Sequence, residues 1–520
     1  MDNSHIITDL SEKWKTLEVL KGDLIQRCEQ YAMWTIPSVC PVDTHDGIEQ
    51  PKGNVAEGAR LVNHLANRIV DTMFPSDKPF FTISLTPEAE QQLEEDLEKD
   101  EHEKYVGDLK QATTQAENAA MRALKITAYR PIAVQAVQHQ IVTGNAIIHR
   151  TETGKRVVYG IKDFCCTRDL KGELLTVILK DSKKFSSLPE SIQDKLKETK
   201  NDYKPDSDVV LYTYYVKEKS RWCRLQGVDH HVVEETKRYY TPTDLPILSL
   251  TWSLSRGESY GRGLVEDHAP SFHNIDVTTL ALLDLIGLAA DFKFLVDPSS
   301  QLDIDELNMA KRGSYNPGKQ GDISVPDFPK RIEIGLLMEA ISKWERLLAQ
   351  AFLLHSAGVR DAERVTAEEI RFYAKELESA YGGLYSRLAL EWQQKEAEYL
   401  LSQIDFAAFN SVGIQTFDVI VTTGMESLSR EGQLDNLRLA IADLQMLEAV
   451  PEDMRGVINA RKFAEYVFAN RGVNLSEFVY TEQELQMQQQ AAEQQQAALM
   501  QAQTDQVVAQ EAGKAAVRSN

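Results

Sequence analysis

Residues 257–263 read GESYGRG and place three glycines in seven positions, immediately before a segment with a helical pattern. Closely spaced glycines can bring backbone amides and a helix N-terminus onto a phosphate. The dinucleotide fingerprint requires G-x-G-x-x-G, and the P-loop requires G-x-x-x-x-G-K-[ST]. The order here is G-x-x-x-G-x-G, and no lysine follows that could reach a terminal phosphate. A turn or hinge is therefore favoured over a nucleotide site.

Histidine, cysteine and acidic residues give no recognisable reactive site. His230 and His231 are adjacent and follow Asp229; on a strand such neighbours point to opposite faces and cannot bind one metal together. Paired acids lie on amphipathic helices, and no nucleophile elbow, H-E-x-x-H or EF-hand pattern occurs. The five cysteines are odd in number and lack C-x-x-C spacing, so we interpret them as reduced structural thiols: Cys28, Cys40, Cys165, Cys166 and Cys223. The sequence therefore predicts no catalytic residue, cofactor or metal.

Composition excludes several classes of protein. The 520 residues are 42% hydrophobic and 26% charged, which is typical of a globular protein with two or more packed regions. Lys and Arg number 57 against 79 Asp and Glu, a net charge of −22, which excludes a broad phosphate-neutralising surface. The N-terminus has no apolar signal region, so synthesis in the cytosol is expected. The most apolar stretch, 277–290, contains Asp284 and is shorter than the roughly 20 residues that span a bilayer.

Hydrophobic periodicity divides the first half of the chain into helical and strand-rich parts. In 55–74 the apolar positions Leu61, Leu65, Ile69 and Met73 recur every four residues and predict one buried stripe. The other expected elements are a helix over 8–34, a strand over 79–86, a charged helix from residue 87 with a solvated acidic face, and a β-rich unit over 146–252 with a short helix at 188–198.

Two helices flank an insert rich in Pro, Gly and Asp in the second half. The first, 272–290, is apolar on most sides from Val277 onward and needs neighbours on several sides. Its polar positions are Asp276, Asp284 and Asp291. The second, 335–354, carries a seam of apolar residues opposite a charged face. The seam consists of Leu337, Ile341, Trp344 and Leu348.

A glycine-containing loop leads from this second helix into a further long helix. Thr366 and Glu369 form a capping box at its start, and Gly382 and Gly383 predict a bend. A strand over 417–430 and a helical region ending near Tyr480 follow. The last residues, 481–520, form a Gln and Ala tract that fits either a helical barrel or a flexible tail.

Several of these segments together resemble one family. They are GESYGRG with the apolar helix after it, LLHSAGVRDAERVTAEEIRFYAKELESAYGGLYSRLALEW, GARLVNHLANRIVDTMFP, YAMWTIPSVCP, VTGNAIIHR and VTTGMESLSREGQLDNL. Taken in their order along the chain, they resemble the portal, or head-to-tail connector, proteins of short-tailed bacteriophages of the podovirus type. The resemblance spans nearly the whole chain, and ERVTAEEIR is its most specific element.

The resemblance implies an α+β, predominantly helical fold that closes into a ring of about twelve copies around a channel for double-stranded DNA. GESYGRG then becomes a flexible junction between a β-rich wing and the first stem helix. The implied parts are the wing (1–265), first stem helix (266–291), clip (292–332), second stem helix (333–354), tunnel loop (355–365), long kinked helix with a return to the wing (366–425), crown (426–480) and the C-terminal tract (481–520).

The same resemblance implies roles for named residues. At the channel constriction Arg360 is the main candidate to contact DNA, whereas Arg364 has the alternative of pairing with Glu368. The remaining tunnel-loop residues are His355, Gly358 and Val359. The seam becomes a stem interface, and the three aspartates become a polar stripe of the stem. The residues implied to bind the tail or the packaging motor at the clip are Lys311, Arg312, Tyr315 and Lys319.

The implied protein sits at the portal vertex of the virion after assembly in the host cytoplasm. Its implied partners are the terminase packaging motor, a tail adaptor, and the major capsid and scaffolding proteins, with internal core proteins as a further class that the resemblance allows. No cofactor or membrane is implied. Two alternatives stand beside it. A nucleic-acid-processing enzyme would need an acidic metal cluster, which the sequence does not display. A helical scaffold of the packaging machinery would have no use for the β-rich middle.

Overall fold

The computed structural model divides the chain into two compact units, Met1–Met425 and Glu426–Asn520. Almost all described residues belong to the first unit, which contains every element reported below. The structure describes residues 9–44, 47–48, 56–76, 79–85, 99–151, 153–198, 204–290, 295–300, 303, 305, 309, 319, 321–324, 331–354, 367–403, 419–423, 441–443, 463 and 466–468.

The N-terminal helical segment is broken at Lys21, which corrects the prediction of one helix over 8–34. Helix α1 (Leu10–Leu20) is capped by Asp9, whose carboxylate accepts from Ser11 N at 2.7 Å, and α2 (Gly22–Trp34) follows. Lys21 is buried, and its Nζ donates to Ile161 O at 2.8 Å and to Phe164 O at 2.7 Å. A buried ammonium must find acceptors, and these acceptors belong to a distant part of the chain.

Two helices form the centre of the first unit. Helix α3 (Glu57–Met73) buries its predicted stripe, since Leu61, Leu65, Ile69 and Met73 are at most 1% exposed. It packs on α6 (Tyr129–Thr143), which follows the long helix α5 (Lys99–Ile126). The small elements before and after α3 are η1 (Pro37–Val39), β1 (Asp43–Thr44), β2 (Gly47–Ile48) and β3 (Phe81–Leu85).

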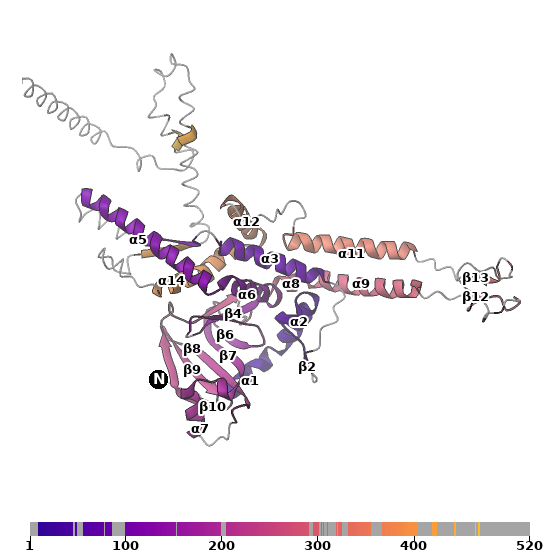
Figure 1. Ribbon diagram of the computed structural model, residues 1–520, viewed down its shortest axis with the longest axis horizontal. Coiled ribbons are helices and arrows are strands. Elements are labelled where there is room, and N and C mark those ends of the chain that lie inside the picture. The colour runs from indigo at the N-terminus through magenta and orange to yellow at the C-terminus, as the bar shows by residue number, and fades with distance from the viewer. Residues whose placement is uncertain are drawn as a thin grey trace, which may run out of the picture. The chain divides into compact units, whose positions relative to one another are not determined.

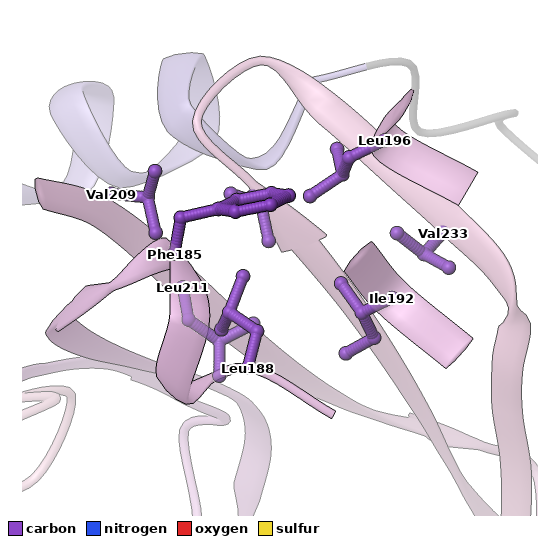
Figure 2. Packing of buried hydrophobic residues seen from close by; sticks show 8 residues of the cluster. Phe185, Leu188, Ile192, Leu196, Val209, Leu211 and Val233 are labelled. Carbon is purple, nitrogen blue, oxygen red and sulfur yellow. The ribbon is translucent and has the colours of Figure 1, made fainter. Parts of the chain in front are cut away.

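The predicted β-rich unit over 146–252 is confirmed as two antiparallel sheets with strand orders β11-β4-β5 and β10-β9-β8-β7-β6. Helix α7 (Glu190–Glu198) and η2 (Phe185–Ser187) cover part of the larger sheet with a cluster of buried apolar side chains that includes Phe185, Ile192 and Val233 (Figure 2). The strands are β4 (Asn145–Arg150), β5 (Arg156–Tyr159), β6 (Phe164–Arg168), β7 (Leu174–Lys184), β8 (Asp208–Glu218), β9 (Arg221–Val228), β10 (His231–Tyr240) and β11 (Ile247–Thr251).

A helical hairpin follows the β-rich unit. After the single turn α8 (Leu264–Asp267), helices α9 (Ala269–Ala290) and α11 (Arg331–Ala351) pack side by side, with a small ladder beyond their far ends (Figure 1). In that ladder β12 (Leu295–Val296) pairs antiparallel with β13 (Ile323–Ser324). The two helices agree closely with the predicted spans, although α11 ends at Ala351 rather than at residue 354.

The bend predicted at Gly382 and Gly383 is confirmed. Helix α12 (Ala367–Ala380) ends before these glycines, which have φ values of 55° and 87° in the left-handed region. The chain continues as α13 (Leu384–Leu388), the π-helical turn η3 (Ala389–Gln394) and α14 (Lys395–Ser402). Strand β14 (Val419–Thr423) then pairs antiparallel with β3, which joins the end of this unit to its N-terminal part.

Candidate functional site

The GESYGRG segment crosses the start of β4 at very short range. A Cβ atom added at Gly263 would lie 2.6 Å from Ile141 O, and one at Gly261 would lie 2.9 Å from Gly144 O. Asn145 donates to Gly261 O at 2.8 Å and accepts from Gly261 N at 2.7 Å. Because these backbone groups already bind other parts of the chain, the segment is better interpreted as a turn than as a phosphate-binding loop. Gly261 and Gly263 are closely packed, whereas Gly257 has a φ of 82° and no atom within 4 Å of an added Cβ, so the flexibility of this junction stays a prediction.

This junction delivers the chain to the foot of the hairpin. Phe272 and Ile275 of α9 are 5% and 2% exposed, and they line a small cavity together with Leu348 of α11. Phe272 also meets Phe352 edge to face, with ring centroids 5.9 Å apart. Apolar packing of this kind fixes the start of α9 against the end of α11. The foot is therefore the most closely packed part of the hairpin within the described residues.

The predicted seam lies on the side of α11 that packs within its own chain. Leu348 is 1% exposed, and Leu337, Ile341 and Trp344 are half-buried. The charged face predicted opposite the seam is exposed at Glu339, Lys343, Arg346 and Gln350. The seam thus packs inside the single chain, and its predicted role as an interface between copies stays a prediction.

Other apolar side chains of the hairpin remain exposed. On α9 the exposed fractions are 50% for Val277, 48% for Leu280 and 52% for Leu283, and on α11 that of Leu336 is 60%. Among the described helices α9 packs mainly on α11 and also contacts α2 near its start, where the ring centres of Trp34 and His273 lie 6.0 Å apart. The sequence predicts neighbours on several sides, and the exposed residues of this arm have none within the described chain. The predicted polar stripe does not share one environment, because Asp276 is half-buried beside Leu348 and Asp284 is exposed.

The far end of α12 is tied to the foot of the hairpin and to the smaller sheet. The Tyr381 hydroxyl donates to Ala351 O at 2.6 Å, and its ring meets Trp252 edge to face at 5.2 Å. Arg387 on α13 donates to Trp252 O. Burial raises the pKa of Tyr381, so the hydroxyl stays protonated and keeps donating at neutral pH. These contacts connect the β-rich unit, the hairpin and the helix that follows residue 366.

A buried ion-pair cluster joins α14 to the smaller sheet. Arg150 and Arg156 are directly opposite each other on β4 and β5, and Glu396 lies between them with 0% of its side chain exposed. Arg150 Nη2 donates to Glu396 Oε2 at 2.9 Å, and Arg156 donates to Glu396 Oε1. Arg150 also lies 4.1 Å from the ring centre of Tyr399. The sequence analysis missed this cluster; its only signal was two arginines on neighbouring strands, which require a shared anion when buried.

Many of the residues singled out by the sequence lie outside the described residues. Among the clip candidates only Lys319 is described; it is exposed, and its backbone N–H donates to Asp322 Oδ2 at 2.7 Å in a turn. The others outside the described residues are His355, Gly358, Val359, Arg360, Arg364, Thr366, Asp291, Lys311, Arg312 and Tyr315.

The histidine pair and the cysteines are placed clearly. His230 lies in a turn rather than on a strand, because Asp229 takes a positive φ of 50°, and its Nδ1 lies 2.8 Å from Asp9 Oδ2. All five cysteines are buried and none of them forms a disulfide, and burial raises the pKa of Cys166 to about 12. Within the described part of the chain no group of three possible metal ligands comes together, and no helix is long and apolar enough to cross a membrane.

Comparison with known proteins shows to which protein family the chain belongs. Residues 8–479 match the family described as bacteriophage head to tail connecting protein. The portal protein of Enterobacteria phage SP6 is 29% identical over 92% of this chain and 91% of its own length, and that of Pseudomonas phage phiKMV is 29% identical over 91% and 92%. The portal protein of Escherichia phage T7 is 26% identical over 89% and 85%. A chain from the neck of an empty gene transfer agent particle aligns over 81% of this chain and 91% of its own at 11% identity, with a TM-score of 0.36, too low to define the fold.

The chain belongs to the bacteriophage head to tail connecting protein family. It is a structural protein of the virion rather than an enzyme.

Proposed function

We propose that this chain is the portal of its phage, a ring of about twelve copies through which double-stranded DNA is packaged and ejected. The observation that carries the proposal is the family match over residues 8–479, together with an arm whose apolar faces are left half-exposed in the single chain. In a closed ring each hairpin would lie between two neighbours. Heterologous contacts of this kind bury such faces without leaving an open end.

The parts of the ring are assigned by their order along the chain. Residues 266–291 and 333–354 form the stem, 292–332 form the clip for the packaging motor and the tail, and 355–365 form the tunnel loop. Residues 1–265 form the wing, 366–425 form the long helix and return to the wing, and 426–480 form the crown. Residues 481–520 form a C-terminal helical barrel or a flexible tail. The hairpin of α9 and α11 and the pairing of β14 with β3 support this order.

An acidic channel suits the passage of DNA. At −22 per chain, a ring of about twelve copies carries roughly −260 before counterions, which repels phosphates and keeps friction low. Arg360, with Arg364 as a second candidate, would supply a narrow cationic collar at the tunnel loop. The proposed protein partners of the ring are the packaging motor, the tail adaptor and the capsid proteins.

Negative-stain microscopy and sedimentation of the full chain test the ring. We expect rings with a central hole, and we expect Leu280→Asp to abolish them, because a charge placed on a half-exposed face of one chain becomes buried between two copies. Val19→Asp is the matched control, since Val19 is 79% exposed on α1 and lies far from the hairpin in sequence. Monodisperse monomers of the unmodified chain, or intact rings of Leu280→Asp, would contradict the proposal.

A further inference from the structure

One buried cation joins three helices at the end of α11. Arg68, on α3, donates from Nη1 to Leu353 O at 2.9 Å, and its guanidinium lies 3.8 Å from the ring centre of Tyr373 on α12. Glu376 on the same helix places Oε2 4.0 Å from Nη1. The side chain of Arg68 is only 11% exposed, so water screens these contacts weakly. Arg68 therefore contacts the end of α11 and the middle of α12 at the same time.

The carbonyl that Arg68 binds belongs to a residue in an unusual backbone conformation. Helix α11 ends in a Schellman motif, in which Leu354 N donates to Ala349 O at 2.7 Å and Leu353 N donates to Gln350 O at 3.1 Å. Leu353 has a φ of 55°, a left-handed conformation that glycine usually supplies. A leucine side chain is retained there because it is buried, with 7% exposed. In this conformation the carbonyl of Leu353 accepts the hydrogen bond from Arg68 on α3.

A histidine on α3 lies beside the same contact. His64 lies one turn before Arg68 on α3. Burial lowers the pKa of His64, and the nearby Arg68 lowers it further, while the backbone of Leu353 acts in the opposite direction. The imidazole is therefore neutral at pH 7 and adds no second charge beside the guanidinium.

We propose that Arg68 is a positioning residue that holds the end of α11 to α12, the two helices that flank residues 355–366. Leu354 is the last described residue before that segment, and Ala367 is the first after it. The inference rests on the proposed function, in which 355–365 line the channel. One side chain in the wing then holds together the two helices that precede and follow the proposed channel segment.

Hydrogen exchange of the full chain, read by mass spectrometry, tests the assignment. Arg68→Met keeps the aliphatic stem and removes the cation. We expect about tenfold faster exchange in peptides covering 349–354 and 372–378, the loss that follows when one hydrogen bond from a charged donor is removed. Peptides from β7 to β9 should not change. Arg60→Met is the matched control on α3, because Arg60 is exposed and bonds to Glu57 within its own helix.

A second variant separates positioning from general packing. Arg68→Lys keeps a donor for Leu353 O but has no planar group to lie over Tyr373. We expect it to restore protection at 349–354 and not at 372–378. Equal exchange in Arg68→Met and the unmodified chain overturns the inference, as does a uniform loss that includes β7 to β9. Because exchange can be measured with or without rings, a chain that forms no rings overturns the proposed function while the exchange result still decides the role of Arg68.

Discussion

Replacing Glu396 with Gln should cost more stability than any single polar change on the surface. The carboxylate is fully buried between two guanidinium groups whose side chains are 2% and 3% exposed. A glutamine of nearly the same volume keeps one acceptor oxygen but turns an amide donor towards one of the arginines. Two buried cations then lose their only shared anion within the described cluster.

The expected cost follows from this arrangement. Removing one partner of a buried ion pair costs about 3–5 kcal/mol, because the remaining charge stays buried without compensation. Urea unfolding followed by tryptophan fluorescence measures it, and Trp392, which donates to Tyr129, is one of the six tryptophans that report the transition. Glu398→Gln is the matched control on the same helix, since Glu398 bonds to Gln394 at 3.1 Å, and it should cost less than about 1 kcal/mol.

A compensating variant tests the reasoning itself. If the cost arises from uncompensated charge, Arg150→Met, Arg156→Met and Glu396→Leu together should recover most of the stability lost in Glu396→Gln, because apolar side chains of similar volume replace buried ions with little loss. A Glu396→Gln protein that unfolds within about 1 kcal/mol of the unmodified chain would refute the reasoning, since it would mean that water already reaches the cluster.

Three further outcomes are expected. Gly263→Ala should destabilise the chain by about 1–3 kcal/mol in thermal unfolding, because its Cβ would meet backbone atoms, whereas Gly335→Ala, with nothing within 4 Å, should not destabilise it; equal effects would contradict the close crossing. Arg360→Glu should allow rings and capsids to form yet shorten the DNA retained in particles, measured by gel sizing, and full-length DNA would remove the collar. Burial acts to raise the pKa of Asp9, but bonds from His230 and the backbone outweigh it and hold the pKa below its usual value. The stabilisation from Asp9 is therefore present at neutral pH and lost as pH falls through that lowered pKa, so Asp9→Ala should destabilise the chain at pH 7 and progressively less under acid.

Local sequence pattern was sufficient for the elements whose burial depends on their own periodicity. The stripe of α3, the β-rich unit, the hairpin helices and the break at Gly382 and Gly383 all follow from spacing and from glycine alone. These features are decided by neighbours within a few residues, so a single sequence contains the information.

The contacts that unite these elements needed the tertiary structure. Arg150 meets Glu396 across 246 positions of sequence, and Arg68 meets Leu353 across 285. The break at Lys21 depends on carbonyls near residue 161, and the close crossing of GESYGRG depends on Gly144. A buried charge or a glycine is stable only beside a particular partner, and no periodic pattern names that partner. The sequence alone determined which elements exist; the tertiary fold decided which charges and backbone groups hold them to one another.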